Sequence, residues 1–146
     1  MPVGFVHNGI DYFFANDSPV IAAAPGRVES VDLIDWGPDA SQRYVVVVTI
    51  RFNTTVVLHY GFEPVTNQTE EGDMQLDMIG VEVGDWVSRG DVIGHFLMMA
   101  DSAHIHFGVV QEGTWRDPTL YTSASAYTEL LEMIHDFHPT WSVSYP

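Results

Sequence analysis

The sequence contains no cysteine and no lysine, and each absence excludes a class of chemistry. Without cysteine the chain has no disulfide bonds, no thiolate metal ligands and no cysteine nucleophile. The sequence has five arginines and 20 acidic residues, so the formal net charge is −15. A field of that sign repels nucleic acid and anionic membrane surfaces, and we therefore expect neither as a partner of this acidic protein.

Long apolar runs are also absent. No run approaches the roughly 18 apolar residues of a membrane-spanning helix, so we expect no membrane insertion. The start, MPVGFVHNGID, has no basic segment followed by an apolar one, and no secretory signal is visible in it. The 146 residues are 46% hydrophobic, which is enough to build the core of a folded domain.

Short apolar segments between glycine, proline and asparagine predict a mainly β fold. The strongest strand signal is RYVVVVTIRF at residues 43–52, whose alternation places Tyr44, Val46, Val48, Ile50 and Phe52 on one face. A hairpin at residues 51–55 and the strand TTVVLHYG follow it. In VEVGDWVSRGDVIGHF, two Gly-Asp turns enclose a short strand, which is typical of the corner of a barrel or folded sheet. Residues 26–34 predict a strand that alternates Val28, Ser30 and Asp32 with Glu29, Val31 and Leu33.

The two remaining segments differ from this pattern. Residues 63–78 are polar and acidic, and they predict a surface loop or insertion. The tail carries a helical spacing of apolar residues, with Ser123 or Ser125 as the N-cap and Pro139 as the stop: Tyr127, Leu130, Leu131, Ile134 and Phe137. We therefore predict a folded antiparallel sheet, or barrel-sandwich hybrid of short strands, over residues 1–121. The C-terminal α-helix and tail, residues 122–146, are predicted to pack on it.

Histidines and one aspartate form the only pattern with clear chemical potential. On a strand, His104 and His106 project to the same side, because side chains repeat with period two. Near the N-terminus His7 and Asp11 are separated by three residues, and His59 follows an apolar run. A catalytic zinc site takes three nitrogen or oxygen ligands and leaves a fourth position to water. His7, Asp11 and one histidine of the pair would supply that set, and the spacing leaves open which one.

The order of these motifs is that of a known family. HNGIDYFF, TTVVLHYG, the double-turn segment and HIHFGVVQEGTWRDP together resemble the lysostaphin-like zinc metallopeptidases of peptidase family M23, which have the duplicated hybrid motif fold. The resemblance runs from about residue 7 to residue 118. It implies a Zn²⁺ cofactor, a substrate among the peptide bonds of bacterial peptidoglycan, and a location outside the cytoplasm.

The resemblance also implies a role for each site residue. Zinc would be held by His7, Asp11 and His106 and would activate water for attack on a peptide carbonyl. His104 would accept the proton of that water and pass it to the leaving amine. His59 would hydrogen-bond the developing oxyanion, and these two roles can be exchanged or shared.

Two alternatives to a zinc peptidase stay open, and the first rests on departures from the family pattern. The segment Phe96–Ala103 is short and hydrophobic where the family has a turn rich in glycine and serine, and Gly108 stands where the family usually has glutamate. A catalytically inactive relative that binds or regulates a partner is therefore one alternative. A phosphocarrier domain of the sugar phosphotransferase type, which has a similar hairpin-rich β fold and paired active-site histidines, is another alternative, although phosphoryl transfer between histidines would not need Asp11.

Overall fold

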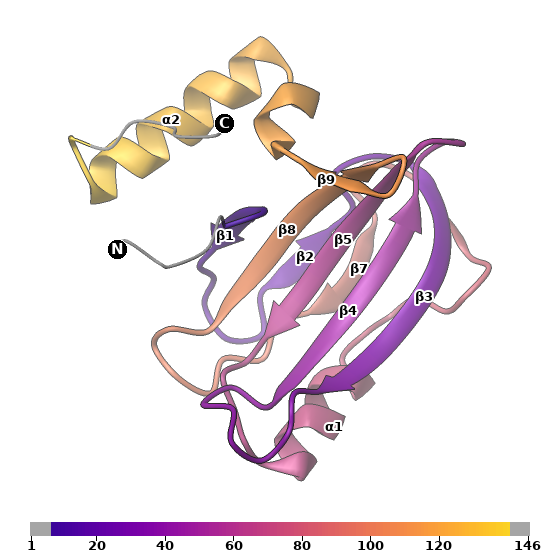
Figure 1. Cartoon of the computed structure of the whole chain (residues 1–146), viewed down its shortest axis with the longest axis vertical. Helices are drawn as coiled ribbons and strands as arrows, with labels where there is room; N and C mark the ends of the chain where they lie inside the picture. The colour runs from indigo at the N-terminus through magenta and orange to yellow at the C-terminus, as the bar shows by residue number, and fades with distance from the viewer. Residues whose placement is uncertain (1–6, 141–146) are drawn as a thin grey trace.

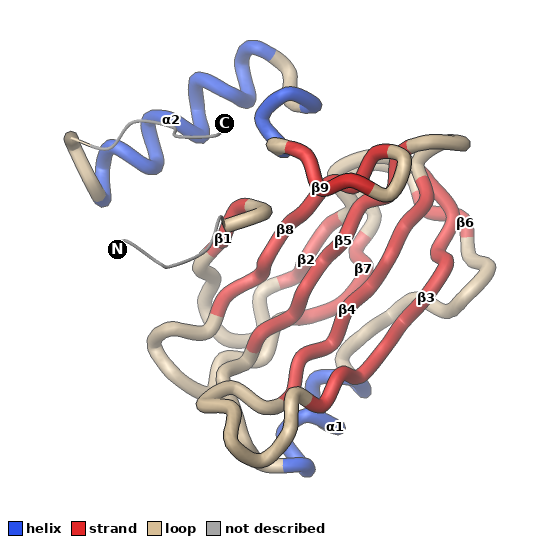
Figure 2. The backbone as a smooth tube through the Cα atoms, viewed as in Figure 1, coloured by secondary structure: helices blue, strands red, loops and turns tan. Residues whose placement is uncertain are grey.

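The computed structural model describes residues 7–140 as one curled antiparallel sheet backed by a small two-stranded ribbon (Figures 1 and 2). The large sheet has the spatial order β1 (Ile10–Tyr12), β8 (His104–Gln111), β5 (Val56–Glu63), β4 (Tyr44–Arg51), β3 (Gly26–Asp35) and β6 (Trp86–Val87), with β9 (Thr114–Arg116) paired to β8. The ribbon consists of β2 (Pro19–Ile21) and β7 (Val92–His95). The predicted mainly β fold with a C-terminal helix is confirmed.

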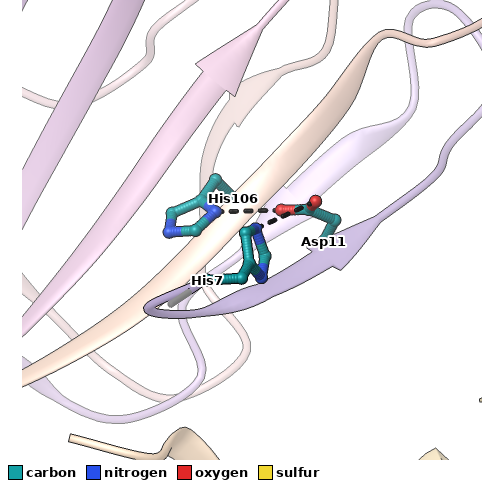
Figure 3. A group of neighbouring side chains, drawn as sticks. All are labelled: His7, Asp11 and His106. Atoms are coloured by element: carbon teal, nitrogen blue, oxygen red, sulfur yellow. Dashed lines mark hydrogen bonds and ion pairs between the residues drawn. The ribbon is translucent and has the colours of Figure 1, made fainter. Parts of the chain in front are cut away.

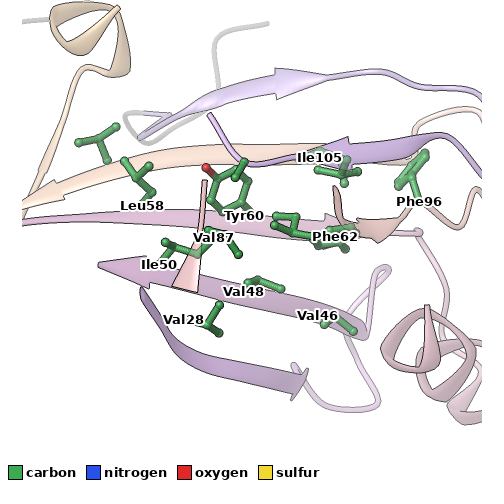
Figure 4. Close-up of a cluster of buried hydrophobic side chains, with 14 of the residues drawn as sticks. Val28, Val46, Val48, Ile50, Leu58, Tyr60, Phe62, Val87, Phe96 and Ile105 are labelled. Atoms are coloured by element: carbon green, nitrogen blue, oxygen red, sulfur yellow. The ribbon is translucent and has the colours of Figure 1, made fainter. Parts of the chain in front are cut away.

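One face of the large sheet packs on the hydrophobic core, and the other face carries the predicted site residues. On the inner face, side chains from β3, β4, β5 and β8 form the core together with residues of the ribbon and of the segment after it (Figure 4): Val28, Val46, Val48, Ile50, Leu58, Tyr60, Phe62, Phe96 and Ile105 are among them. The opposite face of β5 and β8 therefore carries the alternate residues, which include every predicted site residue of these two strands.

Most predicted local features appear in the structure. Tyr44, Val46, Val48 and Ile50 are buried on one face of β4, as predicted, whereas Phe52 lies just beyond the strand and is exposed. In the hairpin that follows, the side chain of Asn53 accepts hydrogen bonds from the backbone N–H groups of Thr55 and Val56. The two Gly-Asp turns direct β6 into the large sheet and β7 into the ribbon, so this segment does form a corner.

The strict alternation predicted for β3 is wrong. The register of β3 against β4 shifts between Val28 and Ser30, which is the signature of a β-bulge. The bulge reverses the phase of the strand. Val28 on one side of it and Val31 and Leu33 on the other therefore all pack on the core.

The predicted surface loop at residues 63–78 is also wrong in two respects. Glu63 is the last residue of β5, and a helix, α1 (Thr69–Asp77), follows it. The helix is polar, and its two buried residues are Gly72 and Gln75, so no apolar stripe announces it. Gly72 packs on the ring of Tyr44. The side chain of Gln75 donates a hydrogen bond to the carbonyl of His95, the last residue of β7, and accepts one from the N–H of Leu97 just after it.

The C-terminal helix, α2 (Ala124–Phe137), begins at Ser123, whose hydroxyl accepts a hydrogen bond from the N–H of Ala126. It follows a short 3₁₀ helix at Pro118–Tyr121. The predicted apolar face is half-buried as far as Ile134, whereas Phe137 is exposed. The boundary at residues 121 and 122, and the packing of the tail on the β domain, stay predictions. Within the described residues no helix is both long and apolar enough to cross a membrane.

Candidate metal centre

Pairing of β1 with β8 brings together residues that are about 95 positions apart in the sequence. Asp11 lies directly opposite His106, so their side chains share one face of the sheet. Oδ1 of Asp11 is 2.9 Å from Nδ1 of His106, and Oδ2 is 3.2 Å from Nε2 of His7 (Figure 3). The ligand atoms of these three residues all lie within 4.8 Å of one another. This is the trio that the resemblance names as metal ligands.

The glycine between His7 and Asp11 has a steric reason. A Cβ built on Gly9 would lie 2.5 Å from Nε2 of His106 and 2.5 Å from the carbonyl oxygen of Phe107. Real side chains do not tolerate such distances, so only glycine lets the start of the chain lie against β8 here. Because Gly9 covers the Nε2 side of the ring, Nδ1 is the nitrogen that points to Asp11.

The donor set fits zinc. Two imidazole nitrogens and a carboxylate oxygen are the ligand types that catalytic zinc sites use. A tetrahedral zinc site with bonds of about 2.1 Å holds its ligand atoms roughly 3.4 Å apart. The separations of 2.9 and 3.2 Å between Asp11 and the two histidines are close to that figure, and all three ligand atoms lie within 4.8 Å of one another. The side chain of His7 is 42% exposed, which leaves one side of the trio open to solvent.

The carboxyl group of Asp11 is held in its charged form. Burial alone would raise its pKa, but the hydrogen bond from His106 and the nearby imidazoles of His104 and His7 lower the pKa below its ordinary value. An ionised carboxylate among histidines is what a divalent cation requires as a ligand.

His104 stands beside the trio and contacts a carboxylate that sequence reasoning missed. Its Nε2 lies 3.2 Å from Oε2 of Glu63 and 3.6 Å from Oδ1 of Asp11. Its Nδ1 lies 2.8 Å from the backbone oxygen of Ser102. A carbonyl can only accept, so Nδ1 carries a hydrogen and Nε2 is the nitrogen that can gain or lose a proton. Glu63 faces His104 across the β5–β8 pair. It lies four residues after His59 on the same strand, so the two-residue period would have placed both side chains on one face.

Electrostatics favour a proton on His104. Burial alone would lower its pKa, but the hydrogen bonds to Glu63 and Ser102 and the charge of Asp11 raise the pKa to about 9. Glu63 is affected reciprocally: burial raises its pKa, and the contacts with His104 and Gln42 lower it below the ordinary value. The pair is therefore arranged to hold a proton at Nε2.

His59 lies on the same face of the sheet, on β5 opposite Gly108, two residue pairs along the ladder from the pair that contains His106. Its ring centroid is 4.9 Å from that of Trp115. Burial is the main reason why the pKa of His59 is lowered, and the nearby His106 lowers it further. A neutral imidazole at this position can donate one hydrogen bond to a substrate. The structure thus brings all five predicted site residues to one face, and Phe13 adds a ring 5.6 Å from that of His104.

The fold and the trio define a class of protein: a curled antiparallel sheet with a candidate His-Asp-His metal centre on one face. The sequence matches peptidase family M23 over residues 5–118, and the chain belongs to that family. A comparison with curated proteins finds no match.

Solved structures with the same fold include two peptidases and a further M23 protein. The catalytic domain of the antimicrobial peptidase lysostaphin from Staphylococcus simulans is 22% identical, with a TM-score of 0.54, over 82% of this chain and 84% of that one. A variant of the catalytic domain of the prophage-encoded M23 protein EnpA from Enterococcus faecalis is 21% identical, with a TM-score of 0.56, over 83% and 82%. A zinc-containing peptidase from Vibrio cholerae is 22% identical, with a TM-score of 0.51, over 75% of this chain. The chain spans only 28% of that longer protein.

Proposed function

We propose that the chain is a zinc-dependent endopeptidase that cleaves peptide bonds in the stem peptides or cross-bridges of bacterial peptidoglycan. The observation that carries this proposal is the convergence of His7, Asp11 and His106 on one point with His104 beside them. Membership of family M23 supports the reaction class, and the peptidoglycan substrate is inferred from the family.

In this proposal His7, Asp11 and His106 hold the metal. Zinc supplies Lewis-acid chemistry at such a site, polarising a carbonyl and making water more acidic. Asp11 orients both partners, because one of its oxygens contacts His106 and the other contacts His7. The hydrogen that Nδ1 of His106 donates to Asp11 must leave that nitrogen before the nitrogen can act as a metal ligand.

His104, with Glu63 beside it, moves the protons of the reaction in this proposal. Nε2 of His104 must first give up the proton that its surroundings favour; it then takes a proton from the attacking water and delivers it to the leaving amine, and Glu63 stabilises the protonated ring. The hydrogen bond from Nδ1 to Ser102 fixes the ring orientation while the proton moves. His59 donates a hydrogen bond to the oxyanion from the other side of His106.

The test compares zinc content and hydrolysis in four proteins: the wild type, Asp11→Asn, His104→Ala and His95→Ala. His95 is a matched control, because this exposed histidine contacts Asp17 and lies outside the proposed site. We expect about one zinc per chain in wild type and a loss of roughly tenfold or more in zinc affinity for Asp11→Asn. His104→Ala should keep its zinc and lose roughly 10²- to 10⁴-fold in the release of amino groups from purified peptidoglycan.

Two outcomes would contradict the proposal. A wild-type protein that fails to bind added zinc would exclude a zinc peptidase. Zinc binding without hydrolysis of peptidoglycan or of synthetic stem peptides would instead support the inactive, partner-binding alternative. The phosphocarrier alternative has lost its support, because the chain belongs to family M23 and keeps the complete His-Asp-His set.

A further inference from the structure

Gly108 is the position where this chain departs from the family's glutamate, and the structure gives it a specific neighbour. A Cβ built on Gly108 would lie 2.4 Å from Cζ3 of Trp115, 3.1 Å from Cε3 and 3.4 Å from Cη2. All three nearest atoms belong to one indole ring. The six-membered part of that ring therefore lies directly on the backbone of β8, in the space that any side chain at Gly108 would need.

The strand β9 places the indole there. Trp115 is paired with Val110 across the β8–β9 hairpin, and side chains of a pair share a face. Val110 and Gly108 are two residues apart on β8, so the ring reaches back from one to the other along the face that also carries His106. Its side chain is 43% exposed, and one surface of the indole remains open to solvent.

The same ring contacts the proposed oxyanion donor. His59 is the direct cross-strand partner of Gly108, and its imidazole lies 4.9 Å from the indole at an interplanar angle of 49°. The missing side chain at Gly108 therefore leaves a notch beside His59, and the indole of Trp115 fills it. A glutamate at this position would have displaced the indole and left the imidazole with a polar neighbour instead of a rigid one.

We propose that Trp115 is a positioning residue: seated in the notch of Gly108, it holds His59 in the orientation needed to hydrogen-bond the reacting carbonyl. Its exposed surface borders the site beside His59. The role of His59 rests on the proposed function, whereas the contact between the two rings does not. Aromatic contacts of this kind are weak individually, so removal of the indole should lower kcat roughly 3- to 10-fold.

The experiment is a double-mutant cycle with zinc-loaded full-length protein: Trp115→Ala, Gly108→Ala and the double variant, with Trp115→Phe as a rescue. The first readout is the proton NMR shift of the His59 ring, assigned with a His59→Gln variant. The ring current of the indole displaces this resonance, and both single variants should move it. The second readout is kcat and KM on peptidoglycan, and zinc content is measured in every protein.

The cycle gives a sharp expectation. In Gly108→Ala the half-exposed indole must swing away from the strand, so this variant should reproduce the NMR and kcat changes of Trp115→Ala. In the double variant the added methyl group should have no further effect, because the atoms that it would meet first are gone. Zinc content should be the same in all variants, and Trp115→Phe should restore part of kcat.

The proposal is overturned if the His59 resonance does not move in Trp115→Ala, or if the resonance moves while kcat and KM stay at the wild-type values. It is also overturned if Gly108→Ala lowers kcat as much in the Trp115→Ala background as in wild type. Should Gly108→Ala fail to fold, Trp115→Ala and Trp115→Phe still decide the question, since the indole is half-exposed. A wild type that binds zinc without hydrolysing peptide bonds refutes the proposed function instead, and the NMR shift then reports on the ring contact alone.

Discussion

Gly9 allows the strongest test of how the candidate metal centre is assembled. Replacing it by alanine places a methyl carbon 2.5 Å from Nε2 of His106 and 2.5 Å from the carbonyl oxygen of Phe107. An ordinary contact needs about 3.4 Å or more, so the chain must move by roughly 1 Å at this point. One obstacle is backbone, and the other is the imidazole held by Asp11, so neither gives way cheaply. The movement separates β1 from β8, and Asp11 moves with it.

The expected magnitude follows from these contacts. Forcing a methyl group into a packed site costs about 1–3 kcal/mol, which for a chain of this size lowers the melting temperature by roughly 3–10 °C. Misplacing a ligand by this amount should weaken zinc binding by roughly 10- to 100-fold. Competition with a coloured zinc chelator measures the affinity, and thermal unfolding followed by circular dichroism measures the stability.

Gly61 supplies a matched control, because it is a second glycine against the same histidine. A Cβ at Gly61 would lie 3.4 Å from Cβ and from the backbone oxygen of His106 and 3.5 Å from Oε1 of Glu63, which are ordinary contacts. Gly61→Ala should therefore keep its zinc affinity within about twofold. Wild-type affinity in Gly9→Ala, or an equal loss in both variants, would refute the steric reasoning.

Two further predictions concern parts of the fold that support the site. Gln75→Leu should lower the free energy of unfolding, measured in urea, by about 2–4 kcal/mol. The substitution leaves the carbonyl of His95 and the N–H of Leu97 without their buried partner. A loss under about 1 kcal/mol would mean that water replaces the amide. Burial raises the pKa of Tyr60 from 10.0 to about 12. Below pH 10 the hydroxyl is neutral in the folded and the unfolded chain, so its contribution to the free energy of unfolding is fully present. Between pH 10 and 12 the hydroxyl ionises only in the unfolded chain. Up to about 3 kcal/mol of the free energy of unfolding is therefore lost as pH rises through this range. Tyr60→Phe, measured by unfolding at pH 8 and 11, should flatten this dependence at the cost of the bond from the N–H of Ala23.

Much of the fold could be predicted, because it rests on local patterns. The alternation in β4 identified its buried face, and the paired Gly-Asp turns identified the corner between β6 and β7. The failures have physical causes. The bulge at Glu29 inserts a residue that no periodicity announces, and α1 buries Gly72 and Gln75 instead of an apolar stripe.

The candidate site shows the same division. Period two placed His104 and His106 on one face, and the same rule applied to β5 would have added Glu63 to His59. Which of the two histidines faces Asp11 could not be read from spacing, since it depends on the register of β1 against β8. That register places Asp11 opposite His106 and leaves His104 to Glu63.

The sequence by itself determined the chemistry that is available: the residue types of a zinc site, their order, and strands that present them on one side. It did so because side-chain identity and the two-residue period of a strand are local properties. Only the tertiary structure decided how these residues meet. The approach of β1 to β8 over Gly9, the carboxylate beside His104 and the indole seated on Gly108 all join segments far apart in the chain. Their register is set by packing of the whole core, and no local pattern encodes that packing.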